Sequence, residues 1–158
     1  YWENPAAPSV HDWTFPETAR KYEIGGTSNY TGAIALGESL GLVNEIGIEN
    51  IQEHIWALSA YCMDQLEAIG ATIITHRDPG RRGGIVMARL YDDLDVDRWV
   101  LKQLHARKIF IAQRFTDYVG GFRISCQYFN NHADIDAMAA AMKELIQEIG
   151  RAPDYKAP

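Results

Sequence analysis

The sequence of residues 120–131 is Gly-Gly-Phe-Arg-Ile-Ser-Cys-Gln-Tyr-Phe-Asn-Asn. Apolar and polar residues alternate in the middle of this stretch, and a period of two predicts a β-strand with two unlike faces. The apolar face is expected to point into a core and consists of Phe122, Ile124, Cys126 and Tyr128. Arg123 and Ser125 then share the opposite face.

Arg123 is the candidate binding residue of this strand. Its guanidinium offers a planar fork of N–H donors that matches a carboxylate, and a strand would hold that fork in a fixed direction. The alternative is an exposed arginine that faces water or an acidic neighbour, which pattern alone favours. Directly after the strand, Asn131 and Asp134 have the spacing of a helix capping box, with Asp in the place of Glu.

Composition limits the classes of partner. The chain has 158 residues, 47% apolar and 23% charged, which is typical of one globular domain. Its 15 Lys and Arg against 21 Asp and Glu give a net charge of −6, and this disfavours nucleic acids and anionic membranes as partners. No apolar run has the length of a membrane span and no signal peptide is evident, so we expect a cytoplasmic protein.

Cysteine and histidine spacing predicts no metal site. The two cysteines, Cys62 and Cys126, could pair with each other, but buried reduced thiols are the simpler interpretation. The five histidines are scattered along the chain, and no two of them stand at a ligand spacing.

The apolar periodicity predicts an α+β fold. It indicates helices over about 31–46, 48–69, 96–104 and 135–149, and strands over about 71–75, 85–90, 108–113 and 122–128. Adjacent strands with helices between and after them predict a small, mainly antiparallel sheet covered by helices. We expect two parts: an arm with a ligand-binding loop over residues 1–30, and a linking helix with a small α+β domain over residues 31–158.

A second dense stretch, residues 22–29, has the sequence Tyr-Glu-Ile-Gly-Gly-Thr-Ser-Asn. Glycines allow a ligand to approach the backbone, and the hydroxyl and N–H groups at a helix start suit a phosphate. The alternative is a loop that ends in an ordinary helix N-cap.

Taken together, the two stretches resemble segments of the class V aminotransferase family, which are pyridoxal-phosphate enzymes of fold type I. Residues 22–29 are similar to the family's Phe-Glu-x-Gly-Thr-x-Asn segment, with one extra residue between Glu23 and the Gly26-Thr27 pair. Residues 123–130 are similar to its Arg-x-Ser-x-x-x-(Phe/Tyr)-Asn segment. The resemblance extends from about Trp13 to the end of the chain.

This resemblance implies the C-terminal part of a homodimeric enzyme that uses pyridoxal phosphate and acts on an amino acid. By resemblance, Arg123 would hold the α-carboxylate of the substrate. Gly26 and Thr27 would reach the cofactor phosphate of the neighbouring subunit. The family's N-terminal large domain would be the missing partner of this piece.

The departures from the family concern the catalytic groups. The family's Schiff-base lysine lies upstream in the large domain, and none of the lysines of this chain has its sequence context. We therefore expect no catalytic residue in this chain and no activity from it alone. Residues 113–121 contain no cysteine, which argues against cysteine desulfuration. The alternative is a non-enzymatic α+β module that binds or dimerises.

Overall fold

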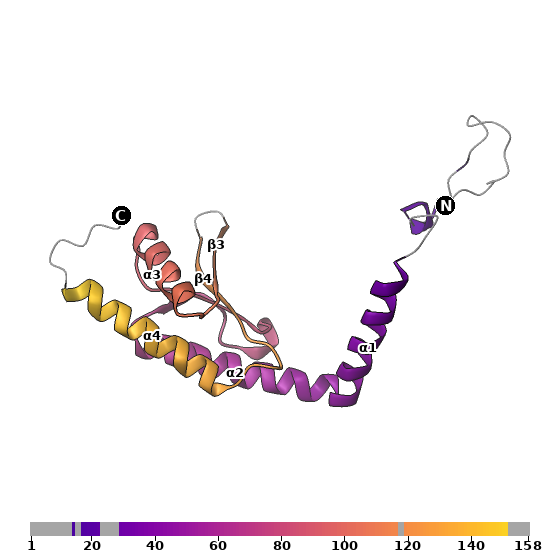
Figure 1. Ribbon diagram of the computed structural model, residues 1–158, viewed down its shortest axis with the longest axis horizontal. Helices are drawn as coiled ribbons and strands as arrows, with labels where there is room; N and C mark the ends of the chain where they lie inside the picture. Colours follow the sequence, from indigo (N-terminus) through magenta and orange to yellow (C-terminus); the bar gives the residue numbers. More distant parts are fainter. Residues whose placement is uncertain (1–13, 15–16, 23–28, 117–118, 152–158) are drawn as a thin grey trace. The chain divides into compact units, whose positions relative to one another are not determined.

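The computed structural model describes residue 14 and residues 17–22, 29–116 and 119–151 (Figure 1). The chain divides into two compact units, Tyr1–Ile46 and Gly47–Pro158. The first contains the 3₁₀ helix η2 (Ala19–Tyr22) and helix α1 (Tyr30–Ile46), and the second contains all the described strands. The division expected after residue 30 stays a prediction.

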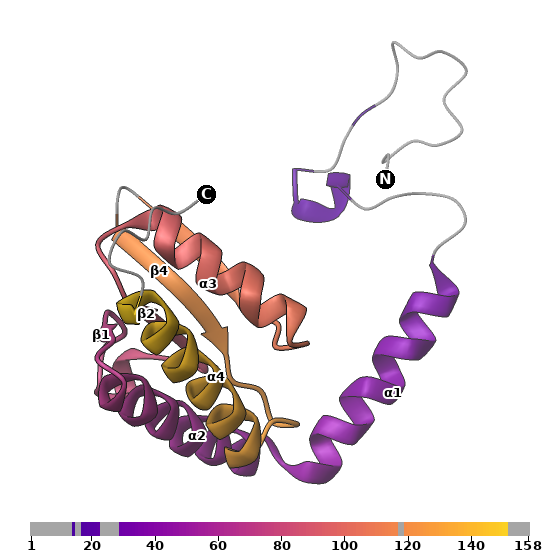
Figure 2. The ribbon, with the colours of Figure 1, turned by 60° about the vertical axis from the view of Figure 1, so that its left-hand side comes forward.

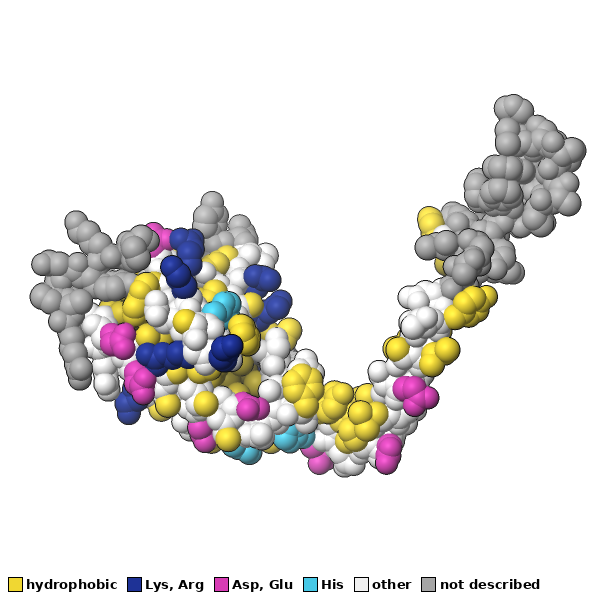
Figure 3. Space-filling model, in the orientation of Figure 1, with side chains coloured by type: hydrophobic (Ala, Val, Ile, Leu, Met, Phe, Trp, Pro, Cys, Tyr) yellow, Lys and Arg dark blue, Asp and Glu magenta, His cyan; other side chains and the backbone are white. Residues whose placement is uncertain are grey.

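Helix α1 begins where hydroxyl and amide residues predicted a helix start. The side-chain Oδ1 of Asn29 accepts a hydrogen bond from the backbone N–H of Gly32 at 2.8 Å, which is the N-cap contact. None of the residues of α1 is buried. Ile34, Leu36 and Leu40 are 69%, 59% and 52% exposed, and hydrophobic side chains are visible on the surface of this helix in Figure 3.

The second unit contains a four-stranded antiparallel sheet in the order β1-β2-β4-β3. The strands are β1 (Thr72–Ile73), β2 (Ile85–Arg89), β3 (Ala112–Thr116) and β4 (Val119–Ser125). Strand β4, which carries Arg123, is paired on both sides. The α+β class and the small antiparallel sheet are thereby confirmed.

Three helices pack on one face of this sheet. They are α2 (Ile48–Ala68), α3 (Leu94–Ala106) and α4 (His132–Arg151). Helix α4 contacts both α2 and α3, and it lies beside α2 in Figures 1 and 2. The residues of the sheet side that join the helices in the core are Val86, Ala88, Phe122 and Ile124 of the strands and Cys126 just after β4. The alternation of residues 122–126 therefore sorts them as predicted.

Several predicted strand boundaries are wrong, and helix and turn hydrogen bonds explain the two described next. The strand expected from residue 108 begins at Ala112, because the N–H groups of Lys108 and Ile109 bond back to His105 and Leu104 at the end of α3. Strand β4 ends at Ser125, short of Tyr128. There the backbone N–H of Gln127 donates to Oδ1 of Asn130 at 3.1 Å and turns the chain.

Candidate functional site

Arg123 lies at the centre of the sheet on the face opposite the core. It stands between Met87 of β2 and Ala112 of β3 in the strand register, and it is half-buried. Its Nε atom is fully buried without a hydrogen-bond partner among the described residues. No described acidic residue forms an ion pair with Arg123. The alternative interpretation, in which Arg123 faces an acidic neighbour, therefore finds no such neighbour in the described part of the chain.

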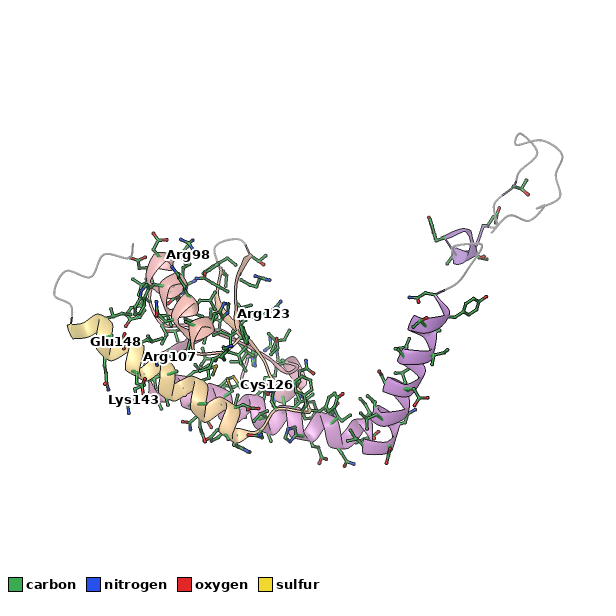
Figure 4. The ribbon with its side chains drawn as sticks, in the orientation of Figure 1. Arg98, Arg107, Arg123, Cys126, Lys143 and Glu148 are labelled. Atoms are coloured by element: carbon green, nitrogen blue, oxygen red, sulfur yellow. The ribbon has the colours of Figure 1, made fainter. Side chains whose placement is uncertain are left out.

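Arg123 lines a cavity of about 630 Å³. Three segments form its walls: residues 105 and 108–112 from the end of α3 to β3, residues 123–126 at the end of β4, and Asn130 with the first turns of α4. A volume of roughly 300–1,000 Å³ is usual for small-molecule sites. Figure 4 shows Arg123 on β4 and Cys126 just beyond the end of that strand.

The α4 wall of the cavity is held by the predicted capping box. Oδ1 of Asn131 accepts from the N–H groups of Ala133 and Asp134, at 2.8 and 3.3 Å. In return, Oδ2 of Asp134 accepts from the N–H of Asn131 at 3.0 Å and from Nδ2 of Asn130 at 3.2 Å. The carboxylate of Asp134 is thus engaged in the helix start, and the capping prediction is confirmed.

The opposite wall contributes two basic side chains, His105 and Lys108. Nε2 of His105 lies 2.9 Å from the carbonyl oxygen of Ile111 and donates to it. No hydrogen bond or ion pair of the Lys108 side chain is found among the described residues. Lys108, Asn130 and Asp134 were not predicted as lining residues, because only the packing of α3 and α4 brings them to Arg123.

Cys126 faces the core and not the solvent. It is 1% exposed and packs against Cys62 of α2, and both thiols are free. The contact with the Cys62 thiol lowers the pKa of Cys126, while burial acts in the opposite direction. Its position agrees with the predicted buried thiol and not with a mobile sulfur carrier.

The remaining predicted site residues, Gly26 and Thr27, lie outside the described residues. In the described part of the chain, no group of three or more His, Cys, Asp or Glu residues is arranged to hold a metal ion. None of the described helices has the length and apolar character needed to cross a membrane.

The model of one protein family, described as aminotransferase class-V, matches residues 3–138. The chain belongs to this family. Members of the class V aminotransferase family depend on pyridoxal phosphate, so this is the cofactor of the family to which the chain belongs.

Relatives of known sequence match most of this chain. A probable cysteine desulfurase of Halalkalibacterium halodurans is 28% identical over 152 residues, which cover 89% of this chain and 36% of the relative. An uncharacterized aminotransferase of Schizosaccharomyces pombe is 28% identical over 127 residues, which cover 80% of this chain and 30% of the relative. The chain therefore spans about a third of the length of these relatives.

Solved structures show the same fold. An apo cysteine desulfurase from Thermococcus onnurineus superposes with a TM-score of 0.73 at 18% identity, over 89% of this chain and 36% of that one. An alanine–glyoxylate aminotransferase from Nostoc has a TM-score of 0.66 at 19% identity, over 82% and 34%. At these identities the likeness concerns the fold alone.

The described residues fit a substrate carboxylate better than they fit the cofactor. The buried Nε of Arg123 is a hydrogen-bond donor without an acceptor among the described residues. A bound carboxylate would supply that acceptor. Of the described lining residues only Asp134 has a carboxylate, and the capping box holds it, so the cavity offers no free acid for the cofactor ring. The described residues alone therefore do not make a pyridoxal-phosphate site.

Proposed function

We propose that this chain is the C-terminal small domain, with its linking helix, of a cytoplasmic, homodimeric pyridoxal-phosphate enzyme, and that Arg123 binds the α-carboxylate of an amino-acid substrate. The observation that supports this most is the half-buried Arg123 in a cavity, with an Nε that no described residue satisfies. The family and its cofactor supply the chemical context.

The position of Arg123 suits a positioning role. Strand β4 is paired with β2 and β3, so the backbone that carries the guanidinium cannot turn away from the cavity. Partial burial removes competing water and strengthens a charge-assisted pair with a carboxylate. In such a site Arg123 would orient the amino acid, and the reacting groups would come from the rest of the enzyme.

The test uses the complete enzyme. Replacing Arg123→Ala should raise KM for the amino acid roughly 10- to 100-fold, as expected for the loss of a hydrogen-bonded charge pair. Arg123→Lys keeps the positive charge but loses the planar fork of donors, so its KM should lie between those of the wild type and Arg123→Ala. The matched control is Arg98→Ala, because Arg98 is an exposed arginine of α3 (Figure 4), and its ion pair with Asp95 is exposed too. Cofactor absorbance should not change, and an unchanged KM would refute this role of Arg123.

We also propose that Gly26 and Thr27 contact the cofactor phosphate of the neighbouring subunit. Hybrid dimers test this: one subunit carries Arg123→Ala and the other Thr27→Val. If the two residues serve different subunits' sites, one site holds both defects and the other holds none. Such hybrids should recover about half of the wild-type kcat/KM. Hybrids as impaired as the two parent variants would place both residues in the same site.

The reaction proposed does not use a thiol of this chain. Residues 113–121 have no cysteine, and Cys126 is buried against Cys62. The complete enzyme should therefore form no persulfide on Cys62 or Cys126 when it is given L-cysteine.

The rival proposal is a non-enzymatic α+β module. A reading frame that continues upstream into a lysine-bearing domain would support the enzyme. A start codon immediately before Tyr1 would support the module.

A further inference from the structure

Lys108 has an unusual backbone conformation at the edge of the Arg123 cavity. Its backbone φ is 65°. Among the described residues other than glycine, a positive φ occurs at Lys108 alone. It follows the end of α3, where its N–H bonds to the carbonyl of His105 at 3.0 Å and the N–H of Ile109 bonds to that of Leu104 at 2.9 Å. This is the Schellman arrangement, in which glycine is the usual residue at the left-handed position.

A lysine here is a strained choice, since a side chain disfavours the left-handed region and glycine does not. A positive charge at a helix C-terminus offsets part of this cost. The interaction of a cation with the helix C-terminus does not depend on a cavity. Lys108 nevertheless lines the same cavity as Arg123.

The other charged groups of the cavity are already engaged. Asp134 accepts two hydrogen bonds in the capping box, and Nε2 of His105 donates to the carbonyl of Ile111. Arg123 and Lys108 have no such partner among the described residues. Among the described residues, Arg123 of β4 and Lys108 at the end of α3 are therefore the cations of the cavity lining without a partner, and they come from different walls.

We propose that Lys108 binds a second anionic group of the substrate, so that this site takes an amino acid with an acidic side chain. Arg123 holds the α-carboxylate and Lys108 the distal carboxylate. This inference rests on the proposed function, because it takes the carboxylate pairing of Arg123 as given. Lys108 is exposed, so its contribution is modest and depends on salt.

The experiment measures binding of two unreactive probes to the complete, cofactor-loaded enzyme by calorimetry at equal ionic strength. Succinate has two carboxylates, and butyrate has the same number of carbons with one. The wild type should bind succinate more tightly than butyrate. Lys108→Gly should weaken the binding of succinate about fivefold and leave the binding of butyrate unchanged. The melting temperature should not fall, because glycine relaxes the left-handed backbone. Lys108→Arg should retain tight succinate binding.

The outcomes separate the two proposals. If Lys108→Gly binds succinate as tightly as the wild type, or if the wild type does not prefer succinate, the role of Lys108 is overturned while that of Arg123 stands. If neither probe binds, or if Arg123→Ala binds butyrate like the wild type, the proposed function itself fails.

Discussion

Asp97 lies in the first turns of α3 with its carboxylate fully buried. Neither carboxylate oxygen makes a hydrogen bond of good geometry to a described residue, and the backbone of Tyr91 offers a weak contact only. Burial raises the pKa of Asp97 to about 6; the backbone of Tyr91 and the charge of Arg89 oppose the shift, and Asp93 and Asp92 add to it. At neutral pH Asp97 is therefore ionised in the folded protein, although burial disfavours its charge.

This predicts that Asp97→Asn stabilises the protein at neutral pH more than at acid pH. The folded pKa of about 6 exceeds the unfolded value of about 3.9, so the contribution of protonated Asp97 is complete below about pH 4 and is lost as the pH rises through 6. Relative to wild type, the free energy of unfolding of Asp97→Asn should improve by about 1–3 kcal/mol between pH 4 and pH 7.5.

Urea denaturation at the two pH values measures this difference. Glu53→Gln, at an exposed position of α2, is the matched control and should show a change of less than about 0.5 kcal/mol. An Asp97→Asn protein whose advantage does not grow with pH would contradict the assignment.

At the level of the element, β4 depends on two glycines that let its neighbours approach. A Cβ atom on Gly120 would lie 2.1 Å from the carbonyl oxygen of Arg114, and one on Gly121 would lie 2.2 Å from that of Ala88. Both obstacles are backbone atoms of paired strands, which cannot move aside without breaking the ladder. Positions 120 and 121 of β4 are therefore restricted to glycine.

We predict that Gly121→Ala destabilises the fold by about 1–3 kcal/mol, as overpacking does. Gly83→Ala is the matched control, since a Cβ at Gly83 meets no atom within 4 Å. Gly83→Ala should be neutral or stabilising by up to about 1 kcal/mol, because alanine lowers the conformational entropy of the unfolded chain. Denaturant unfolding followed by circular dichroism compares the two, and equal stabilities would refute the close approach at Gly121.

At the level of the whole molecule, the two units differ in what they bury. The unit Gly47–Pro158 has a core that joins three helices to the sheet. Arg107, which follows α3, forms ion pairs with Glu144 and Glu148 of α4; Figure 4 labels Arg107 and Glu148. Helix α1 buries no residue in spite of its apolar composition. A helix that is apolar on most of its surface normally has a partner.

We therefore expect the 158-residue chain on its own to self-associate through α1. Replacing Ile34, Leu36 and Leu40 by Gln should reduce the association and the binding of a hydrophobic dye, because it removes exposed apolar area. Sedimentation velocity measures the first and dye fluorescence the second. Glu38→Gln should change neither, and a wild-type chain that is monomeric and binds no dye would contradict this expectation.

Much of the fold was predictable because it depends on residues close in the sequence. The alternation of residues 122–126 sorts side chains between two faces whatever the strand pairs with. The capping box of Asn131 and Asp134 closes within one helical turn. Strand boundaries were less predictable. Ile109, for example, is β-branched, as is typical of strands, but its backbone N–H bonds to the carbonyl of Leu104 at the end of α3.

The sequence by itself determined the order of the elements, the α+β class and the orientation of Arg123 away from the core. Only the tertiary structure decided that Arg123 lines a cavity with Lys108 and Asp134, and that Asp97 is buried without a partner. The reason is physical: periodicity and capping arise from neighbours along the chain, whereas burial and cavity walls arise from segments that lie far apart in sequence and meet only when helices pack on the sheet.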